Sequence, residues 1–345
     1  MVGYARASCV LSSRLCGRAN HPTEVNVNRI AILLGAALML APGWFMTATA
    51  QDKTKVVLGT ATPGGGFPLY GGAVAEVINA TDPSLSIEPQ NTKGSTENVP
   101  LLEEGKLDIA LVQGEVATGA LLGMGRAPAD LKIIAAMYST PGMFVVRRDS
   151  PYRTIADLKG KPVAFGAKGS GLVILARYVL DGIGLDPDKD FQAIYLDRAG
   201  DGPAMVLDGR AAALWGGGIG WPGFTAVSTS EGGARFIAPN AEEGARIRAK
   251  HSFLKAITVP AGSYPGIDAP LESVGSFSFI LARPTLDQDV AYRIARALHR
   301  GAAALQQKLA QARETTAANT AAGAPRHDMI HPGVLNYLRE VGVVR

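Results

Sequence analysis

Short apolar runs alternate with longer amphipathic stretches from about residue 55 onward. Apolar runs that are bounded by glycine, proline or charged residues predict strands. We predict strands at residues 55–58, 107–113, 133–136, 143–147, 162–166, 192–196, 211–215 and 276–281. Helical patterns lie between them, at residues 73–78, 97–104, 172–181 and 203–207. This alternation predicts an α/β protein with largely parallel sheets.

The C-terminal part predicts one long amphipathic helix at residues 287–309, with a single apolar face. That face is formed by Val290, Ile294, Ala297, Leu298 and Leu305.

Two segments share the order helix, glycine, basic residue, strand: LLEEGKLDIAL at residues 101–111 and MVLDGRAAAL at residues 205–214. We therefore predict two α/β domains with the same order of helices and strands. The late strand and the long helix return the chain to the first domain. Lobe I is predicted to comprise residues 51–146 and 259–345, and lobe II residues 147–258. The two crossing strands form a hinge, and ligand sites often lie between domains.

An apolar stretch, IAILLGAALMLAPGWF, occupies residues 30–45 and follows Arg29. The small residues of Ala48-Thr49-Ala50 come after it. This pattern predicts a cleavable signal peptide of residues 1–50, with cleavage before Gln51 and export to the periplasm. The alternative is a membrane anchor, for which the stretch is short. A start near Val25 or Val27 would give a leader of more usual length, with residues 1–24 as a misannotated extension.

Removing the leader changes the charge and the cysteine content. The full chain carries a formal net charge of +4, and the predicted mature chain has 30 basic and 29 acidic residues, a net charge of +1. Both cysteines, Cys9 and Cys16, lie in the leader. The mature chain therefore needs no disulfide, and its charge gives no reason to expect a nucleic-acid partner.

The most glycine-rich stretch is GTATPGGGFPLYGG at residues 59–72. It has no lysine for a phosphate-binding P-loop, and Leu69 takes the third glycine position of a dinucleotide turn. Around Ser170, Lys168 and Leu172 replace the glycines of a hydrolase nucleophile elbow. His327 and His331 are four residues apart, but Pro332 follows and no carboxylate motif supports a metal. We predict a solvated or helix-capping role for the pair, and neither cofactor nor metal.

The glycine loops supply backbone N–H groups at helix N-termini, which attract carboxylates and other anions. Gly64, Gly65 and Gly66 open one helix, Gly94 with Ser95 and Thr96 a second, and residues 169–171 a third in the other half. A single loop of this kind is more simply a tight turn. Three at matched places predict one shared ligand site.

Five segments in this order resemble the TAXI family, the extracytoplasmic solute-binding proteins of TRAP transporters. The segments are GTATPGGGFPLYGG, NTKGSTENVPLLEEGKLDIALVQ, TIADLKGKPVAFGAKGSG, VPAGSYPG and HPGVLNYLREVG. The resemblance covers residues 55–342. It implies a two-lobed periplasmic binding protein of type II, which clamps a small organic acid or amino acid between its lobes. It also implies delivery to TRAP membrane permease subunits that an ion gradient drives.

The resemblance also implies which residues contact the ligand. The carried-over positions are Thr60, Ala61, Gly65, Gly66, Phe67, Lys93, Gly94, Ser95, Thr96, Asn98, Gln113, Ser170 and Gly171. The bulky and then small strand end of Trp215 and Gly216 departs from the family pattern, as does Lys93.

Several of these residues have a second interpretation. Lys93 pairs with a ligand carboxylate or is solvated, and Trp215 stacks on the ligand or belongs to the interdomain core. Tyr264 lines the cleft or packs a turn. Glu115 would repel an anion, so we expect it to bind an amine or to face the partner.

Two other functions share this scaffold. An NMT1-like binding protein of an ABC importer would have the same fold, and a secreted enzyme or a periplasmic sensor partner is a further alternative. We expect no enzyme, because the chain has no catalytic triad motif, metal cluster motif or paired acid motif.

Overall fold

The computed structural model describes residues 52–345, and the predicted leader lies outside this part. The described strands form a mixed sheet in the order β2-β1-β3-β10-β4-β7-β5-β6, with β8 paired to β4 and β9 to β10. Their bounds are β1 Thr54–Gly59, β2 Leu85–Gln90, β3 Ile109–Val112, β4 Lys132–Arg147, β5 Pro162–Ala167, β6 Gln192–Leu196, β7 Ala213–Gly217, β8 Ala234–Ile237, β9 Lys255–Val259 and β10 Leu271–Ala282.

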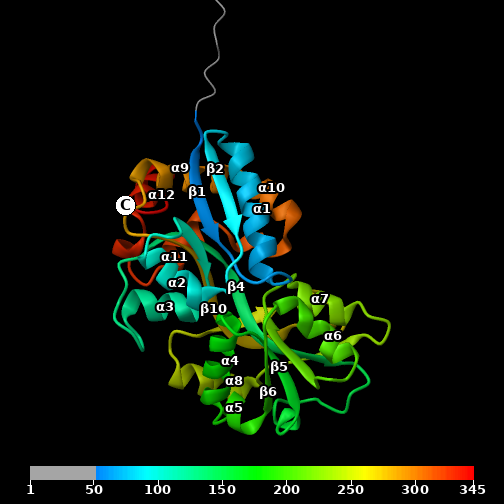
Figure 1. Cartoon of the computed structure of the whole chain (residues 1–345). Helices are drawn as coiled ribbons and strands as arrows, with labels where there is room; N and C mark the ends of the chain where they lie inside the picture. Colours follow the sequence, from blue (N-terminus) through cyan, green and yellow to red (C-terminus); the bar gives the residue numbers. More distant parts are fainter. Residues whose placement is uncertain (1–51) are drawn as a thin grey trace, which may run out of the picture. The chain divides into compact units, whose positions relative to one another are not determined.

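Two groups of strands are parallel, as the alternating pattern predicts. In the first lobe β1 pairs with β2 and β3, and in the second lobe β5 pairs with β6 and β7. The strands that link the lobes, β4 and β10, run antiparallel to their neighbours. Figure 1 shows the first lobe, with β1, β2 and α1, above the second, with β5 and β6.

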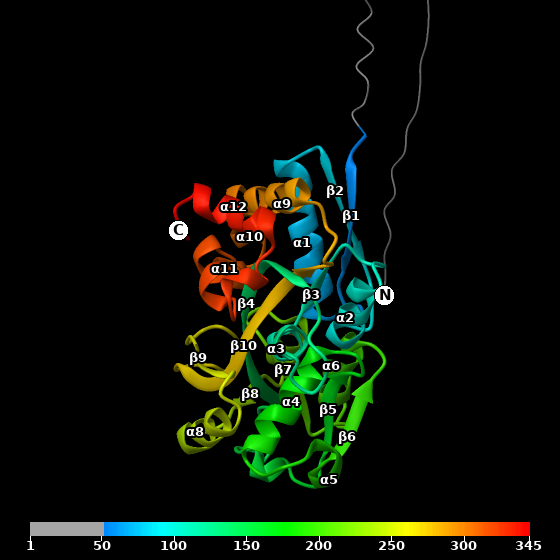
Figure 2. The same cartoon turned by 90° about the vertical axis from the view of Figure 1, so that its left-hand side faces the viewer.

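Helices cover the sheet of each lobe. The first lobe has α1 Gly66–Thr81, α2 Ser95–Glu103, α3 Gly114–Leu122, α9 Gln288–Arg300, α10 Ala302–Lys308, α11 Ala317–Gly323 and α12 Pro332–Glu340. The second has α4 Gly171–Gly182, α5 Pro187–Asp190, α6 Gly202–Leu207, α7 Pro222–Ser228 and α8 Ala241–Lys250. The C-terminal helices therefore pack on the first lobe, as Figure 2 also shows. No helix within residues 52–345 has the length and apolar character that crossing a membrane requires.

The strands predicted at residues 133–136 and 143–147 are one continuous strand, β4. Pro141 does not end it, because the strand changes partners there. Pro141 is opposite Gly275 of β10, and the next residue, Gly142, is opposite Gly217 of β7. The N–H that proline lacks thus falls at the border between two ladders, where its loss costs least.

The single helix predicted at residues 287–309 is instead two helices, α9 and α10, that meet at Gly301. A Cβ atom on Gly301 would lie 2.3 Å from Val77 Cγ1 of α1. The apolar face was predicted correctly, since Val290, Ile294 and Leu298 are buried. The break occurs where the chain comes too close to α1 for any side chain.

Each lobe has its own apolar interior. The core of the first lobe joins α1, α9 and α12 to the sheet. The second lobe has two smaller cores, one centred on Phe165 and Trp215 and the other on Phe224. The two lobes are connected through β4 and β10, and the space between them is the place where ligands often bind in such proteins.

Candidate functional site

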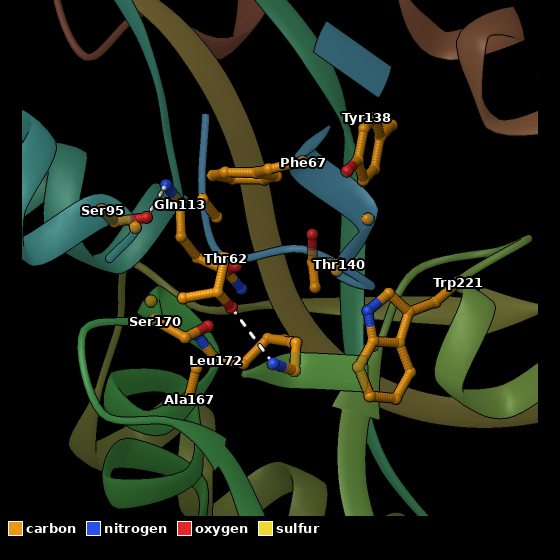
Figure 3. A pocket seen from close by; sticks show the side chains of 17 residues that line it. Thr62, Phe67, Ser95, Gln113, Tyr138, Thr140, Ala167, Ser170, Leu172 and Trp221 are labelled. Carbon is orange, nitrogen blue, oxygen red and sulfur yellow. Dashed lines mark hydrogen bonds between the residues drawn. The ribbon is translucent and has the colours of Figure 1, made fainter. Parts of the chain in front are cut away.

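A cavity that is partly open to solvent lies between the two lobes (Figure 3). Both lobes contribute to its lining. The lining residues are Ala61, Thr62, Gly65, Gly66, Phe67, Gly94, Ser95, Gln113, Tyr138, Thr140, Ala167, Ser170, Gly171, Leu172, Ala199, Gly217 and Trp221.

Four helices begin at this cavity. Their N-cap residues are Gly65 of α1, Gly94 of α2, Gln113 of α3 and Ser170 of α4. Each helix follows a parallel strand, and the carboxyl ends of those strands meet at the gap between the lobes, where open α/β sheets bind ligands. The first N–H groups of a helix have no partner within the helix. The cavity therefore presents several main-chain donors and the positive ends of four helix dipoles.

Gly171 brings the helices of the two lobes close together. A Cβ atom on Gly171 would lie 2.3 Å from Gln113 Cβ and 2.8 Å from Ser95 Oγ. The starts of α2, α3 and α4 are therefore in mutual contact. Within the described chain, the backbone N–H groups of Ser95 and Gly171, each the first residue of its helix, have no hydrogen-bond partner. They remain available to a ligand.

The end of the cavity where α2, α3 and α4 begin is lined by four polar side chains, those of Thr62, Ser95, Gln113 and Ser170 (Figure 3). Ser95 Oγ accepts a hydrogen bond of 3.0 Å from the backbone N–H of Gln113, and Ser170 Oγ accepts one of 3.1 Å from that of Leu172. The Gln113 side-chain amide is different. Its residue is 3% exposed, and its Nε2 atom has no partner in the described chain. A buried amide donor without a partner costs free energy, so Nε2 is poised to bind a ligand acceptor.

The opposite end of the cavity is aromatic. Phe67, Tyr138 and Trp221 surround the start of α1, where a Cβ atom on Gly66 would lie 3.0 Å from Trp221 Cδ1 and 3.6 Å from Tyr138 Oη. Burial raises the pKa of the Tyr138 hydroxyl, which therefore stays protonated. This end offers flat apolar surface with a few neutral donors.

None of the residues that line the cavity is charged. Any attraction for an anion therefore comes from main-chain N–H groups, helix dipoles and neutral side chains. Glu115, two residues after Gln113, does not line the cavity. It is 2% exposed, Ser276 Oγ donates to its Oε1 at 2.6 Å, and burial raises its pKa to about 7.

Hydrogen bonds cross the gap at two points on the rim of the cavity. Thr96 Oγ1 donates to the backbone oxygen of Gly169 at 3.0 Å, and the backbone N–H of Ala199 donates to Thr62 Oγ1 at 3.1 Å. The lobes therefore contact each other on both sides of the cavity.

The cavity brings together nine of the predicted site residues from four segments of the chain. These are Ala61, Gly65, Gly66, Phe67, Gly94, Ser95, Gln113, Ser170 and Gly171.

Four other predicted residues lie around the rim or beneath the loops. Thr60 Oγ1 donates to the backbone oxygen of Gln90, and Asn98 Nδ2 donates to those of Thr60 and Leu111. These bonds hold the strand ends in place. Lys93 is exposed beside Glu97, and Thr96 makes the bond across the gap.

The remaining three predicted residues support the cavity from behind. Trp215 is fully buried and its Nε1 donates to the backbone oxygen of Leu172, which is the core interpretation of that residue. Gly216 lies under Trp221, and a Cβ atom on Gly216 would lie 2.3 Å from Trp221 Cζ3. Tyr264 Oη accepts from the Trp221 N–H and donates to the Gly218 oxygen, both at 2.7 Å. Gly216 and Tyr264 therefore position Trp221.

Eight lining residues were not among those predicted: Thr62, Tyr138, Thr140, Ala167, Leu172, Ala199, Gly217 and Trp221. Thr62 belongs to the first glycine loop, and it could have been predicted as a ligand contact together with the glycines of that loop. Trp221 follows the run Gly216–Gly220, and glycines just before an aromatic residue are a usable signal of close backbone approach. Tyr138 and Thr140 are mid-strand residues of β4, with no local signal.

The two C-terminal histidines do not share a site. His331 is buried, its Nδ1 accepts from the Gly333 N–H as the cap of α12, and its Nε2 contacts the backbone oxygen of Leu286. His327 begins a short 3-10 helix and is exposed. The capping role predicted for this pair therefore belongs to His331.

Residues 58–342 match the model of the NMT1-like family, and because the match covers most of the chain, the chain belongs to this family. Among solved structures it is similar to a periplasmic transporter, at 12% identity over 85% of this chain and 94% of that chain, with a TM-score of 0.52. It is also similar to a protein from Bordetella bronchiseptica RB50, at 18% identity over 84% and 81%, with a TM-score of 0.51.

A third similar structure is the periplasmic aliphatic sulphonate binding protein SsuA from Escherichia coli, at 21% identity over 84% of each chain, with a TM-score of 0.46. At these identities the likeness concerns the fold alone. The predicted two-lobed α/β fold of periplasmic binding proteins is thereby confirmed.

Proposed function

We propose that this member of the NMT1-like family is an extracytoplasmic solute-binding protein, which captures a small carboxylate-bearing solute between its lobes and delivers it to a membrane permease. The observation that carries the proposal is the convergence of four helix N-termini from both lobes on one uncharged cavity. Such termini bind anions through N–H groups and helix dipoles.

Capture works by a shift of population between open and closed forms. A solute that contacts Ser95 and Gln113 on the first lobe and Gly171 on the second reaches all three only when the lobes meet. Its extra affinity for the closed form then favours closure. The hydrogen bonds from Thr96 to Gly169 and from Ala199 to Thr62 join the two lobes and therefore stabilise the closed form alone.

The transporter class follows from the resemblance to the TAXI family, which favours a TRAP permease driven by an ion gradient. Family membership equally supports the alternative, an NMT1-like binding protein of an ABC importer. A neighbouring gene for a many-helix permease favours the first and a neighbouring ATPase gene the second. In both cases we propose a periplasmic location, which the predicted signal peptide supports, and neither role requires enzymatic activity.

A thermal-shift screen of the purified protein tests the proposal. The panel contains small carboxylates, the corresponding neutral amides and amino acids. A solute at 100 times its dissociation constant should stabilise the protein by about 2.7 kcal/mol, because it binds the folded state alone. We expect at least one carboxylate to raise the melting temperature and its amide to do so less. A panel in which no carboxylate raises the melting temperature would contradict the proposal.

A further inference from the structure

We infer that the solute is a monocarboxylate with a short apolar body and no ammonium group, bound with its carboxylate at Gln113 and its body against Trp221. The inference rests on the proposed function and specifies which carboxylates the cavity accepts. It depends on the different chemistry of the two ends of the cavity.

Hydrogen-bond donors without a partner line the end of the cavity that we assign to the carboxylate. Gln113 Nε2 is buried and makes no hydrogen bond within the described chain, although the Gln113 amide also helps to lower the pKa of Glu115. Ser95 and Gly171, whose backbone N–H groups are free, are the residues that contact Gln113. These three donors come from α3, α2 and α4. A carboxylate has two oxygens with about four acceptor positions, so one such group satisfies all three donors at once. The helix dipoles favour its charge at the same place.

Aromatic side chains line the end of the cavity that we assign to the apolar body of the solute. Tyr138 and Trp221 line the end away from Ser95 and Ser170, and Phe67 lies between the two ends, as Figure 3 shows. Tyr138 Oη and Trp221 Nε1 have no hydrogen-bond partner within residues 52–345, so a neutral oxygen on the ligand is tolerated there. A second carboxylate is disfavoured, because no cationic side chain lines the cavity to offset its desolvation.

An ammonium group is disfavoured at either end. No carboxylate side chain lines the cavity, and the positive helix ends repel a cation. Glu115 does not substitute for one, since it does not line the cavity. Free amino acids would therefore lose the hydration of their ammonium group without gaining a partner.

Titration calorimetry with three matched compounds tests the inference on the purified protein. Butyrate carries one carboxylate, 4-aminobutyrate adds an ammonium group to the same chain, and succinate adds a second carboxylate. We expect butyrate to bind at least tenfold more tightly than the other two. Equal or tighter binding of 4-aminobutyrate or succinate would overturn the inference while leaving the proposed function in place. Absence of binding by all three would also overturn the inference, whereas the proposed function is decided by the wider thermal-shift panel.

Substitution of Gln113 tests the orientation. Gln113→Glu keeps the shape and places a negative charge beside the ligand carboxylate, so butyrate should bind at least tenfold more weakly. Gln113→Met removes the donor without adding charge and should weaken binding less. Gln192→Glu makes the same chemical change at an exposed position of β6 and should leave affinity unchanged. A Gln113→Glu variant that melts like the wild type and binds butyrate equally well would refute the placement.

Discussion

Glu115 is a buried acid on the first turn of α3, whose Oε2 atom has no hydrogen-bond partner in the described chain. Burial raises its pKa from 4.5 to about 7, and the hydrogen bond from Ser276 opposes this only in part. Its surroundings at the meeting of α3 with β10 explain why: the carboxyl group is enclosed and the structure offers it no cation.

The raised pKa predicts a loss of stability as the pH rises. Between pH 4.5 and about 7 the folded state keeps the Glu115 proton and the unfolded state has lost it. The free energy of unfolding should therefore fall by about 3 kcal/mol over this interval and then level off. In urea denaturation at pH 5 and pH 8, Glu115→Gln should lack this decrease, and the exposed Glu231→Gln should retain it. Parallel pH profiles for Glu115→Gln and wild type would contradict the assignment.

At the scale of elements, the starts of the helices do most to form the cavity. Gly171 begins α4 with conventional backbone angles, so the need for glycine there is steric, set by Gln113 and Ser95 of the other lobe. Gly72, inside α1, has no heavy atom within 4 Å of an added Cβ. Substitution by alanine should therefore be harmful at Gly171 and tolerated at Gly72, so that the second variant is a control for the first.

Gly171→Ala should weaken binding of the best solute at least tenfold by keeping the lobes apart, with a small effect on the melting temperature. The reason is that the added methyl group overlaps only with atoms of the opposite lobe. Gly72→Ala should leave affinity unchanged and stabilise the protein by about 0.5–1 kcal/mol, since alanine is the better helix former. Calorimetry and thermal melting measure both. Unaltered affinity in Gly171→Ala would show that closure does not bring these helix starts together.

Most strands of the sheet could be predicted from the sequence, but β2, β8, β9, α3, α7 and α8 were not among the predicted elements. Glycine-bordered turns located the starts of α2 and α4 to within about two residues, whereas the helical pattern at residues 73–78 begins well after the start of α1 at Gly66. The continuity of β4 and the break at Gly301 could not be predicted in this way. Both depend on contacts across the fold, with Gly217 and Gly275 in one case and with Val77 in the other.

At the scale of the whole molecule, the cavity exists because the lobes meet at loops distant in sequence. A Cβ atom on Gly65 would lie 3.5 Å from Ala199 Cβ, across the gap. Disulfides have Cβ atoms about 3.5–4.5 Å apart. The predicted mature chain contains no cysteine that would compete.

The double substitution Gly65→Cys with Ala199→Cys should therefore lock the lobes together on oxidation. The oxidised, ligand-free protein should take up solute far more slowly than wild type, and dithiothreitol should restore uptake. The single variant Gly65→Cys is the control for the effect of the side chain itself. Stopped-flow binding measures the rates, and rapid uptake by the oxidised double variant would argue against entry through an opening gap.

About half of the residues that line the cavity could be predicted from the sequence, and the other half could not. Main-chain donors at matched loops could be inferred locally. Tyr138 and Thr140 face the cavity only because β4 passes between the lobes, and Trp221 is held there by Tyr264, 43 residues away. Such tertiary placement has no local sequence pattern.

The passage of β4 and β10 through both lobes has a further consequence. Each lobe includes in its own sheet a length of strand that continues into the other, and residues 52–345 belong to one compact unit. Excising either lobe would remove a structural strand from the one that remains. The two halves should therefore unfold together as one cooperative system, and a destabilising change in one half should lower the stability of both.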